Sequence, residues 1–67
     1  MDEQEATDNL EVLCGGGERA FRLMRLYSAA DTASGRETQT KKEIFTQMAL
    51  DDGYVVAAIV AYLDYVA

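Results

Sequence analysis

The last fourteen residues of the chain, 54–67, contain a single charged residue, Asp64, although the chain as a whole is strongly acidic. The other thirteen are Tyr, Val, Ala, Ile and Leu. A surface helix normally shows a polar face opposite its apolar stripe, and because this segment has almost none, it requires cover on most of its sides. A chain of 67 residues has little other material to provide that cover. The segment therefore predicts contact with a partner protein or with a second copy of the chain.

The length predicts one domain, 1–67, with a marginal core, because folding a chain of this size removes only about 60% of its surface from water. Domains this small usually need disulfides, a metal, very good helix packing or association. Cys14 is the only cysteine and the chain has no histidine, so neither an internal disulfide nor the usual zinc ligand sets can form. We expect no metal and no cofactor, and we expect packing and association to stabilise the fold.

Charge is unevenly distributed along the chain. All six basic residues lie between positions 19 and 42, and the net charge is −6. Five acidic residues precede the first basic one: Asp2, Glu3, Glu5, Asp8 and Glu11. A net negative charge repels phosphate backbones, so direct nucleic-acid binding is not expected. The five acidic residues are instead candidates for steering the protein onto a basic surface.

Glycines and capping patterns define four helical stretches, since the chain contains no proline. Asp2 and Glu5 resemble a capping box for a first helix, which Gly15–Gly17 must end. The alternative for residues 1–8 is a flexible acidic tail. A second helix is predicted over 18–33, with a wide apolar face that includes Phe21 and Met24, and Gly35 is expected to stop it.

A third helix is predicted after a polar loop over 34–40. Thr40 and Glu43 form a second capping box, and Ile44, Phe45, Met48 and Ala49 follow on one face. Asp51-Asp52-Gly53 is expected to break this helix and to offer an N-cap to the fourth. A β-hairpin turn at the same triplet is the alternative, although the alanine content and length of the final segment favour helix. The predicted fold class is all-α, a compact bundle of three or four short helices with the largely apolar C-terminal helix at its centre.

Helical periodicity divides the fourth helix into two sides. The side assigned to the core consists of Val55, Val56, Ile59, Val60, Tyr62, Leu63 and Val66. The side assigned to a protein interface consists of Tyr54, Ala57, Ala58, Ala61, Asp64 and Tyr65. Alanines allow another backbone to approach closely, and tyrosines supply contact area with a polar tip. The alternative is that these alanines cover one flank of a monomeric bundle.

No residue pattern identifies an active site, and we expect no enzymatic activity. Gly15–Gly17 precedes a helix but lacks the Gly-Lys-Ser/Thr ending of a phosphate-binding loop. Cys14 has no recognisable partner base, which favours a small buried thiol over a reactive one. Arg19, Arg22 and Arg25 are spaced by three, which suits a solvated helix face or, as the alternative, a basic docking stripe. A faint helix-turn-helix rhythm over 48–62 lacks the polar side chains needed to read DNA.

The sequence thus predicts a small acidic protein that binds, and regulates or inhibits, another protein, and that forms a homodimer. If the partner's basic surface normally holds nucleic acid, the chain would compete for it by charge mimicry. The alternatives are an assembly subunit that self-associates through its C-terminal helix and a thiol-dependent redox or carrier protein that uses Cys14. The single cysteine favours the cytoplasm. A ten-residue apolar run is half of what a bilayer span needs, and the N-terminus lacks a signal-peptide pattern, so no membrane segment is expected.

Overall fold

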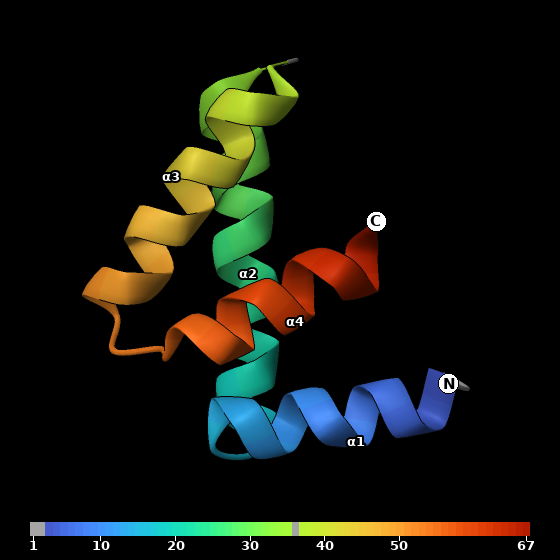
Figure 1. Cartoon of the computed structure of the whole chain (residues 1–67). Helices are drawn as coiled ribbons and strands as arrows, with labels where there is room; N and C mark the ends of the chain where they lie inside the picture. The colour runs from blue at the N-terminus through green and yellow to red at the C-terminus, as the bar shows by residue number, and fades with distance from the viewer. Residues whose placement is uncertain (1–2, 36) are drawn as a thin grey trace.

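Helix α2 is the longest helix, and the other three are arranged around it in the computed structural model (Figure 1). The elements are α1 (Glu3–Cys14), α2 (Gly17–Ser34), α3 (Thr38–Asp51) and α4 (Val56–Val66). The structure describes residues 3–35 and 37–67, and these contain no strand. The predicted all-α bundle is therefore confirmed, and the alternative hairpin at Asp51-Asp52-Gly53 is wrong. The central helix, however, is α2 and not the C-terminal helix.

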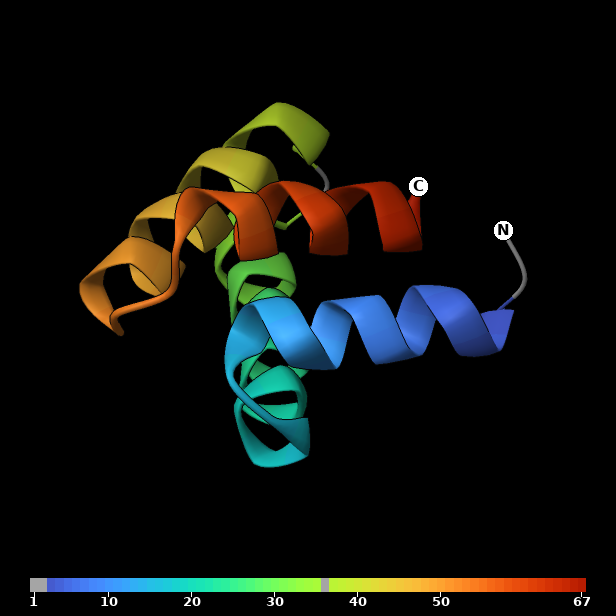
Figure 2. The same ribbon diagram turned by 60° about the horizontal axis from the view of Figure 1, so that its bottom comes forward.

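Helix α3 runs antiparallel along α2, while α1 packs against the N-terminal end of α2. Helix α4 crosses in front of α2, contacts both α1 and α3, and runs in the opposite direction to α1. The first turn of α1 and the last turn of α4 consequently lie on the same side of the molecule (Figure 2). Helices α1 and α4 are therefore antiparallel neighbours that extend to one side of the α2–α3 pair.

The first glycine stop is a Schellman motif at the end of α1. Gly15 has a φ of 92°, a left-handed conformation that favours glycine. The Gly16 N–H donates to the Glu11 carbonyl over 2.8 Å, and the Gly15 N–H donates to the Val12 carbonyl over 3.3 Å. These two bonds satisfy carbonyl groups that a helix end otherwise leaves without partners. The predicted stop at Gly15–Gly17 is confirmed.

The same motif ends α3 and determines where Tyr54 lies. Gly53 has a φ of 89°, its N–H donates to the Leu50 carbonyl over 3.1 Å, and the Tyr54 N–H donates to the Ala49 carbonyl over 3.0 Å. A Schellman motif usually brings the residue after its glycine into apolar contact with the preceding helix. Tyr54 accordingly lies before α4, and it is buried together with Ala49.

The connection between α2 and α3 is shorter than expected. The stop at Gly35 is confirmed, but α3 already begins at Thr38, so Thr40 and Glu43 lie inside the helix and the capping box predicted there is wrong. No glycine or proline separates residue 38 from the apolar face of α3, and the helix therefore extends back toward Gly35. Helix α1 is formed from Glu3 onward, whereas the Asp2 half of the other capping box lies outside the described residues.

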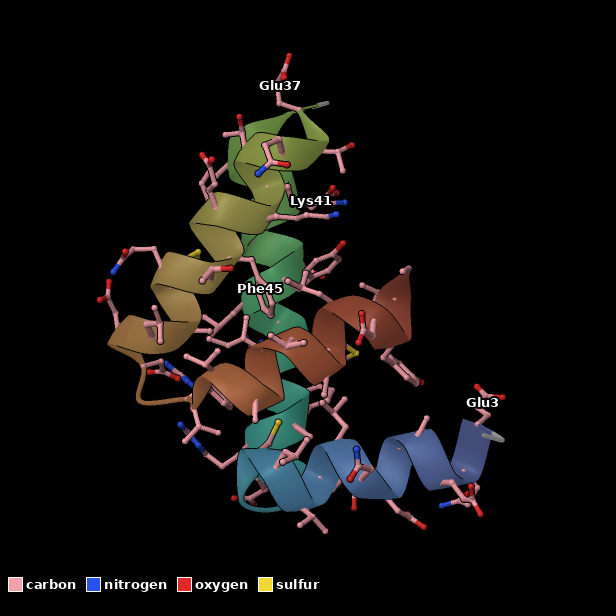
Figure 3. All side chains as sticks on the ribbon, in the orientation of Figure 1. Glu3, Glu37, Lys41 and Phe45 are labelled. Carbon is pink, nitrogen blue, oxygen red and sulfur yellow. The ribbon has the colours of Figure 1, made fainter. Side chains whose placement is uncertain are left out.

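The core gathers at the point where α2, α3 and α4 meet. Phe45 and Leu23 are its largest fully buried side chains. Phe45 points from α3 toward α2 (Figure 3), and its ring lies edge-on to that of Tyr27, with the ring centroids 5.1 Å apart. Tyr62 of α4 completes the group, 5.3 Å from Tyr27 and 5.5 Å from Phe45. Side chains from three helices thus hold α4 across α2, and edge-on aromatic pairs of this kind add stability beyond their buried area.

Candidate functional site

The structure reassigns the two sides of the C-terminal helix. Of the six candidate interface residues, Tyr54 is 5% exposed and Ala58 is fully buried, so neither can contact a partner. Ala61 is half-buried, and only Ala57, Asp64 and Tyr65 are exposed. Tyr54 was misplaced because it belongs to the turn and not to the helix. Ala58 was assigned to the wrong side because nearly every residue of α4 is apolar. The spacing of apolar residues then does not show which side of the helix faces the core.

Four valines that were assigned to the core are exposed instead, and Val66 is the least exposed of them at 38%. Val55, Val56 and Val60 are 56%, 63% and 51% exposed, and Leu50 beside the turn is 44% exposed. Ile59 and Tyr62 are buried as predicted. The outer side of α4 is therefore an apolar strip, which we define as Val55, Val56 and Val60.

A groove of about 230 Å³ lies between α1 and α4 over the face of α2. It is lined by Thr7, Leu10 and Glu11 of α1, by Gly17, Ala20, Phe21 and Met24 of α2, and by Tyr62 and Tyr65 of α4. Phe21, Met24 and Tyr65 are 58%, 43% and 45% exposed, which is unusual for large apolar side chains that share one hollow. Contiguous exposed apolar surface of this kind is typical of an interaction site.

This groove was not predicted from the sequence. The sequence places Phe21 and Met24 in the wide apolar face of the second helix, without indicating which part of that face is covered. This apolar face is wider than the neighbouring helices can cover, because Leu23 and Ala30 are buried whereas Phe21 is exposed. The width of the face in the sequence was the one observation that could have indicated an uncovered surface.

Helix α1, which forms one side of the groove, carries four acidic residues, which we call the acidic flank. Glu3, Glu5, Asp8 and Glu11 are all exposed, and α1 contains no basic residue. Glu11 itself lines the groove, and Glu3 projects from the far end of α1 (Figure 3). Asp2, the fifth candidate steering residue, lies outside the described residues.

Arg19 and Arg22 do not form a free docking stripe, because both bind Asp52 at the end of α3. The Arg22 Nε and Nη2 donate to the two carboxylate oxygens of Asp52 over 2.5 and 3.1 Å, and the Arg19 Nη2 donates to the Asp52 carbonyl over 2.9 Å. The Arg19 guanidinium also stacks 4.0 Å from the centre of the Tyr54 ring, whose hydroxyl donates to the Arg19 carbonyl. The arginines therefore fix the turn between α3 and α4 to α2.

This cluster predicts a specific sensitivity to acid. The hydrogen bond from Arg22 lowers the pKa of the Asp52 carboxyl below its ordinary value of 3.8. A carboxyl whose pKa is lower in the folded than in the unfolded state stabilises the fold at pH values above its unfolded-state pKa. This stabilisation is lost as the pH falls through the pKa of the folded state. We expect the stability of Asp52→Asn to fall less than that of the wild type between about pH 5 and pH 2. Urea denaturation at a series of pH values measures this difference.

The matched control for this prediction is Asp51→Asn, because the Asp51 carboxylate accepts a hydrogen bond from Gln47 within α3. Asp51→Asn should keep the full acid sensitivity of the wild type. Equal loss of stability for wild type and Asp52→Asn would show that the ion pairs with Arg19 and Arg22 do not contribute to the fold.

Cys14 lies in the core at the end of α1 and is 7% exposed. Burial raises the pKa of its thiol, and the nearby charge of Arg19 opposes this only in part. A raised pKa disfavours the thiolate, which is the reactive form. The structure thus confirms the interpretation of Cys14 as a small buried side chain. No group of three or more potential metal-ligating side chains occurs within residues 3–35 and 37–67.

No helix in the described part of the chain combines the length and apolarity needed to cross a membrane. No family model matches the chain, and no curated protein or solved structure matches it significantly. Inference about function therefore depends on the groove, the acidic flank of α1 and the apolar strip of α4.

Proposed function

We propose that this chain is a small, non-catalytic protein-binding module that regulates or inhibits a protein with a basic surface. The observation that carries the proposal is the acidic flank of α1, where Glu3, Glu5, Asp8 and Glu11 are exposed on a helix without a basic residue. The exposed side chains of the neighbouring groove supply apolar contact area next to these charges. Interfaces commonly combine an apolar centre with a charged rim in this way.

The charge distribution suggests how such a module reaches its target. A net charge of −6 attracts a basic surface over distances comparable to the screening length, and this attraction acts mainly on the association rate. A basic surface that holds nucleic acid is one such target, and the chain would then occupy it by charge mimicry. The single free thiol suits action in a reducing compartment such as the cytoplasm.

Neutralising the flank should slow association with little effect on dissociation. We expect the variant Glu3→Gln, Glu5→Gln, Asp8→Asn, Glu11→Gln to bind a partner recovered by affinity capture with an on-rate about tenfold or more below that of the wild type. The difference should shrink at high salt. Surface plasmon resonance at low and physiological salt measures both rates.

The matched control neutralises four exposed acidic residues outside α1, on α2, on α3 and at the N-cap of α3: Glu18, Glu37, Glu43 and Asp51. It has the same net charge as the α1 variant but keeps the acidic flank. If both variants associate equally fast, only net charge matters and the flank has no special role. If neither differs from the wild type at low salt, charge steering is wrong.

Self-association is the second candidate function, and the apolar strip Val55, Val56 and Val60 favours it. The strip carries no charge, so two copies of this acidic chain could meet there without placing like charges together. Light scattering over a hundredfold concentration range distinguishes the two functions: an assembly subunit grows in mass, and Val60→Arg stops this growth. A wild type that remains a monomer throughout leaves the regulator as the supported function.

A further inference from the structure

The groove between α1 and α4 has an apolar floor that the fold leaves without cover. Phe21 and Met24 lie one turn apart on α2, and Tyr65 extends the same surface from the last turn of α4. All three are roughly half exposed even though buried core residues lie next to them: Tyr62 contacts Tyr65 with the ring centroids 6.2 Å apart, and Leu10 is 6% exposed. The floor is thus held by the core and not by a mobile loop, and it exists before any partner binds.

The acidic residues beside this groove lie mainly on α1: Glu11 lines the groove, whereas Asp64 of α4 does not. Helices α1 and α4 contain five Asp and Glu residues and not one Lys or Arg: Glu3, Glu5, Asp8, Glu11 and Asp64. The arginines of α2 face elsewhere, because Arg19, Arg22 and Arg25 line a separate hollow that shares only Phe21 with the groove. An apolar surface beside one acidic helix is complementary to an apolar stripe with basic residues along one edge.

The dimensions favour a helix over a small molecule. A volume of about 230 Å³ is below the 300–1,000 Å³ that is usual for small-molecule sites. It suits instead one or two bulky side chains presented by a larger partner. The apolar lining that α1, α2 and α4 contribute also provides the kind of surface that an amphipathic helix uses in helix-in-groove recognition.

We propose that the groove binds a basic amphipathic α-helix of the partner protein. Bulky apolar side chains of that helix, spaced by three and four residues, lie against Phe21, Met24 and Tyr65, and its Lys and Arg side chains face the carboxylates of α1. This inference rests on the proposed function, because it names the element of the basic partner that the module recognises. It adds that recognition needs the amphipathic pattern and not positive charge alone.

The test uses a synthetic peptide of Leu and Lys with the leucines on one helical face. An isomer of the same composition, with its order scrambled so that no apolar face forms, is the peptide control. We expect the wild type to bind the amphipathic peptide at least about tenfold more tightly than the scrambled isomer, as judged by isothermal titration calorimetry. Equal affinity for the two peptides would overturn the proposal, since only charge would then be recognised.

Two matched protein variants locate the site. Met24→Lys introduces a positive charge into the groove, and Val60→Lys introduces the same charge on the outer strip of α4, at a residue of similar exposure. We expect Met24→Lys to weaken binding of the amphipathic peptide at least about tenfold and Val60→Lys to change it less than about threefold. Circular dichroism verifies that both variants remain folded. Equal effects of the two variants would place binding outside the groove.

These experiments distinguish failure of the groove proposal from failure of the proposed function. If the α1 variant slows association with the captured partner but Met24→Lys and Val60→Lys bind the peptide equally, the module recognises a basic surface through another face and the groove proposal is wrong. If the flank has no effect on association and the wild type does not bind the amphipathic peptide, both proposals are wrong.

Discussion

Replacing Ala58 with Arg is expected to unfold the protein. Ala58 is fully buried on the inner side of α4, close to Ile59 and Tyr62 of the core. Overpacking a core position by even a few methylene groups costs about 1–3 kcal/mol, and the buried guanidinium would lack a partner, which adds a further cost. A domain of this length has a free energy of unfolding of roughly 3–10 kcal/mol. We therefore expect circular dichroism to show little helix in Ala58→Arg at 25 °C.

Val60→Arg is the matched control, because it places the same side chain two residues further along the same helix, at a position that is 51% exposed. We expect its unfolding midpoint in urea to be close to that of the wild type, within the ±0.5 kcal/mol typical of surface substitutions. If Ala58→Arg were as stable as Val60→Arg, the inner side of α4 would be accessible, and the interface originally assigned to Ala58 and Ala61 would regain support.

Local chemistry explains why most helix ends could be predicted from the sequence. Glycine adopts left-handed backbone conformations at little cost. Gly15, Gly35 and Gly53 therefore end α1, α2 and α3 through local backbone geometry, independently of tertiary packing. Capping boxes were less reliable, because a side-chain cap is only one way to satisfy a helix start. Thr40 and Glu43 have the right spacing, yet α3 begins before them with Glu37 as an N-cap without a side-chain hydrogen bond.

The candidate site was harder to predict, because it depends on how the helices are rotated and packed. In α3 the apolar residues are separated by polar ones, and the prediction that Phe45 and Ala49 face the core is confirmed. In α4 almost all residues are apolar, so sequence could not distinguish Ala58 inside from Val60 outside. The groove combines residues of α1, α2 and α4, and nothing in the order of the chain indicates that Phe21 lies near Tyr65.

The aromatic centre of the fold should be as sensitive as the inner side of α4. Phe45 is fully buried, and its ring joins Tyr27 of α2 to Tyr62 of α4 with centroid distances of 5.1 and 5.5 Å. Truncating a buried phenylalanine to alanine costs about 3–5 kcal/mol through lost apolar transfer and the remaining cavity. This loss is comparable to the whole stability expected of a 67-residue domain. We expect Phe45→Ala to be largely unfolded or to melt far below the wild type in a thermal scan followed by circular dichroism.

Phe21→Ala is the control for this prediction, since it removes the same atoms from a side chain that is 58% exposed in the groove. Its cost should be about 1 kcal/mol or less, in the range of surface substitutions. The two variants also separate folding from recognition: Phe45→Ala should lose peptide binding because it loses the fold, whereas Phe21→Ala should keep the fold and lose affinity. A Phe45→Ala variant as stable as Phe21→Ala would show that the contact of α2, α3 and α4 at Phe45 is not the centre of the core, and would remove the support on which the groove between α1 and α4 depends.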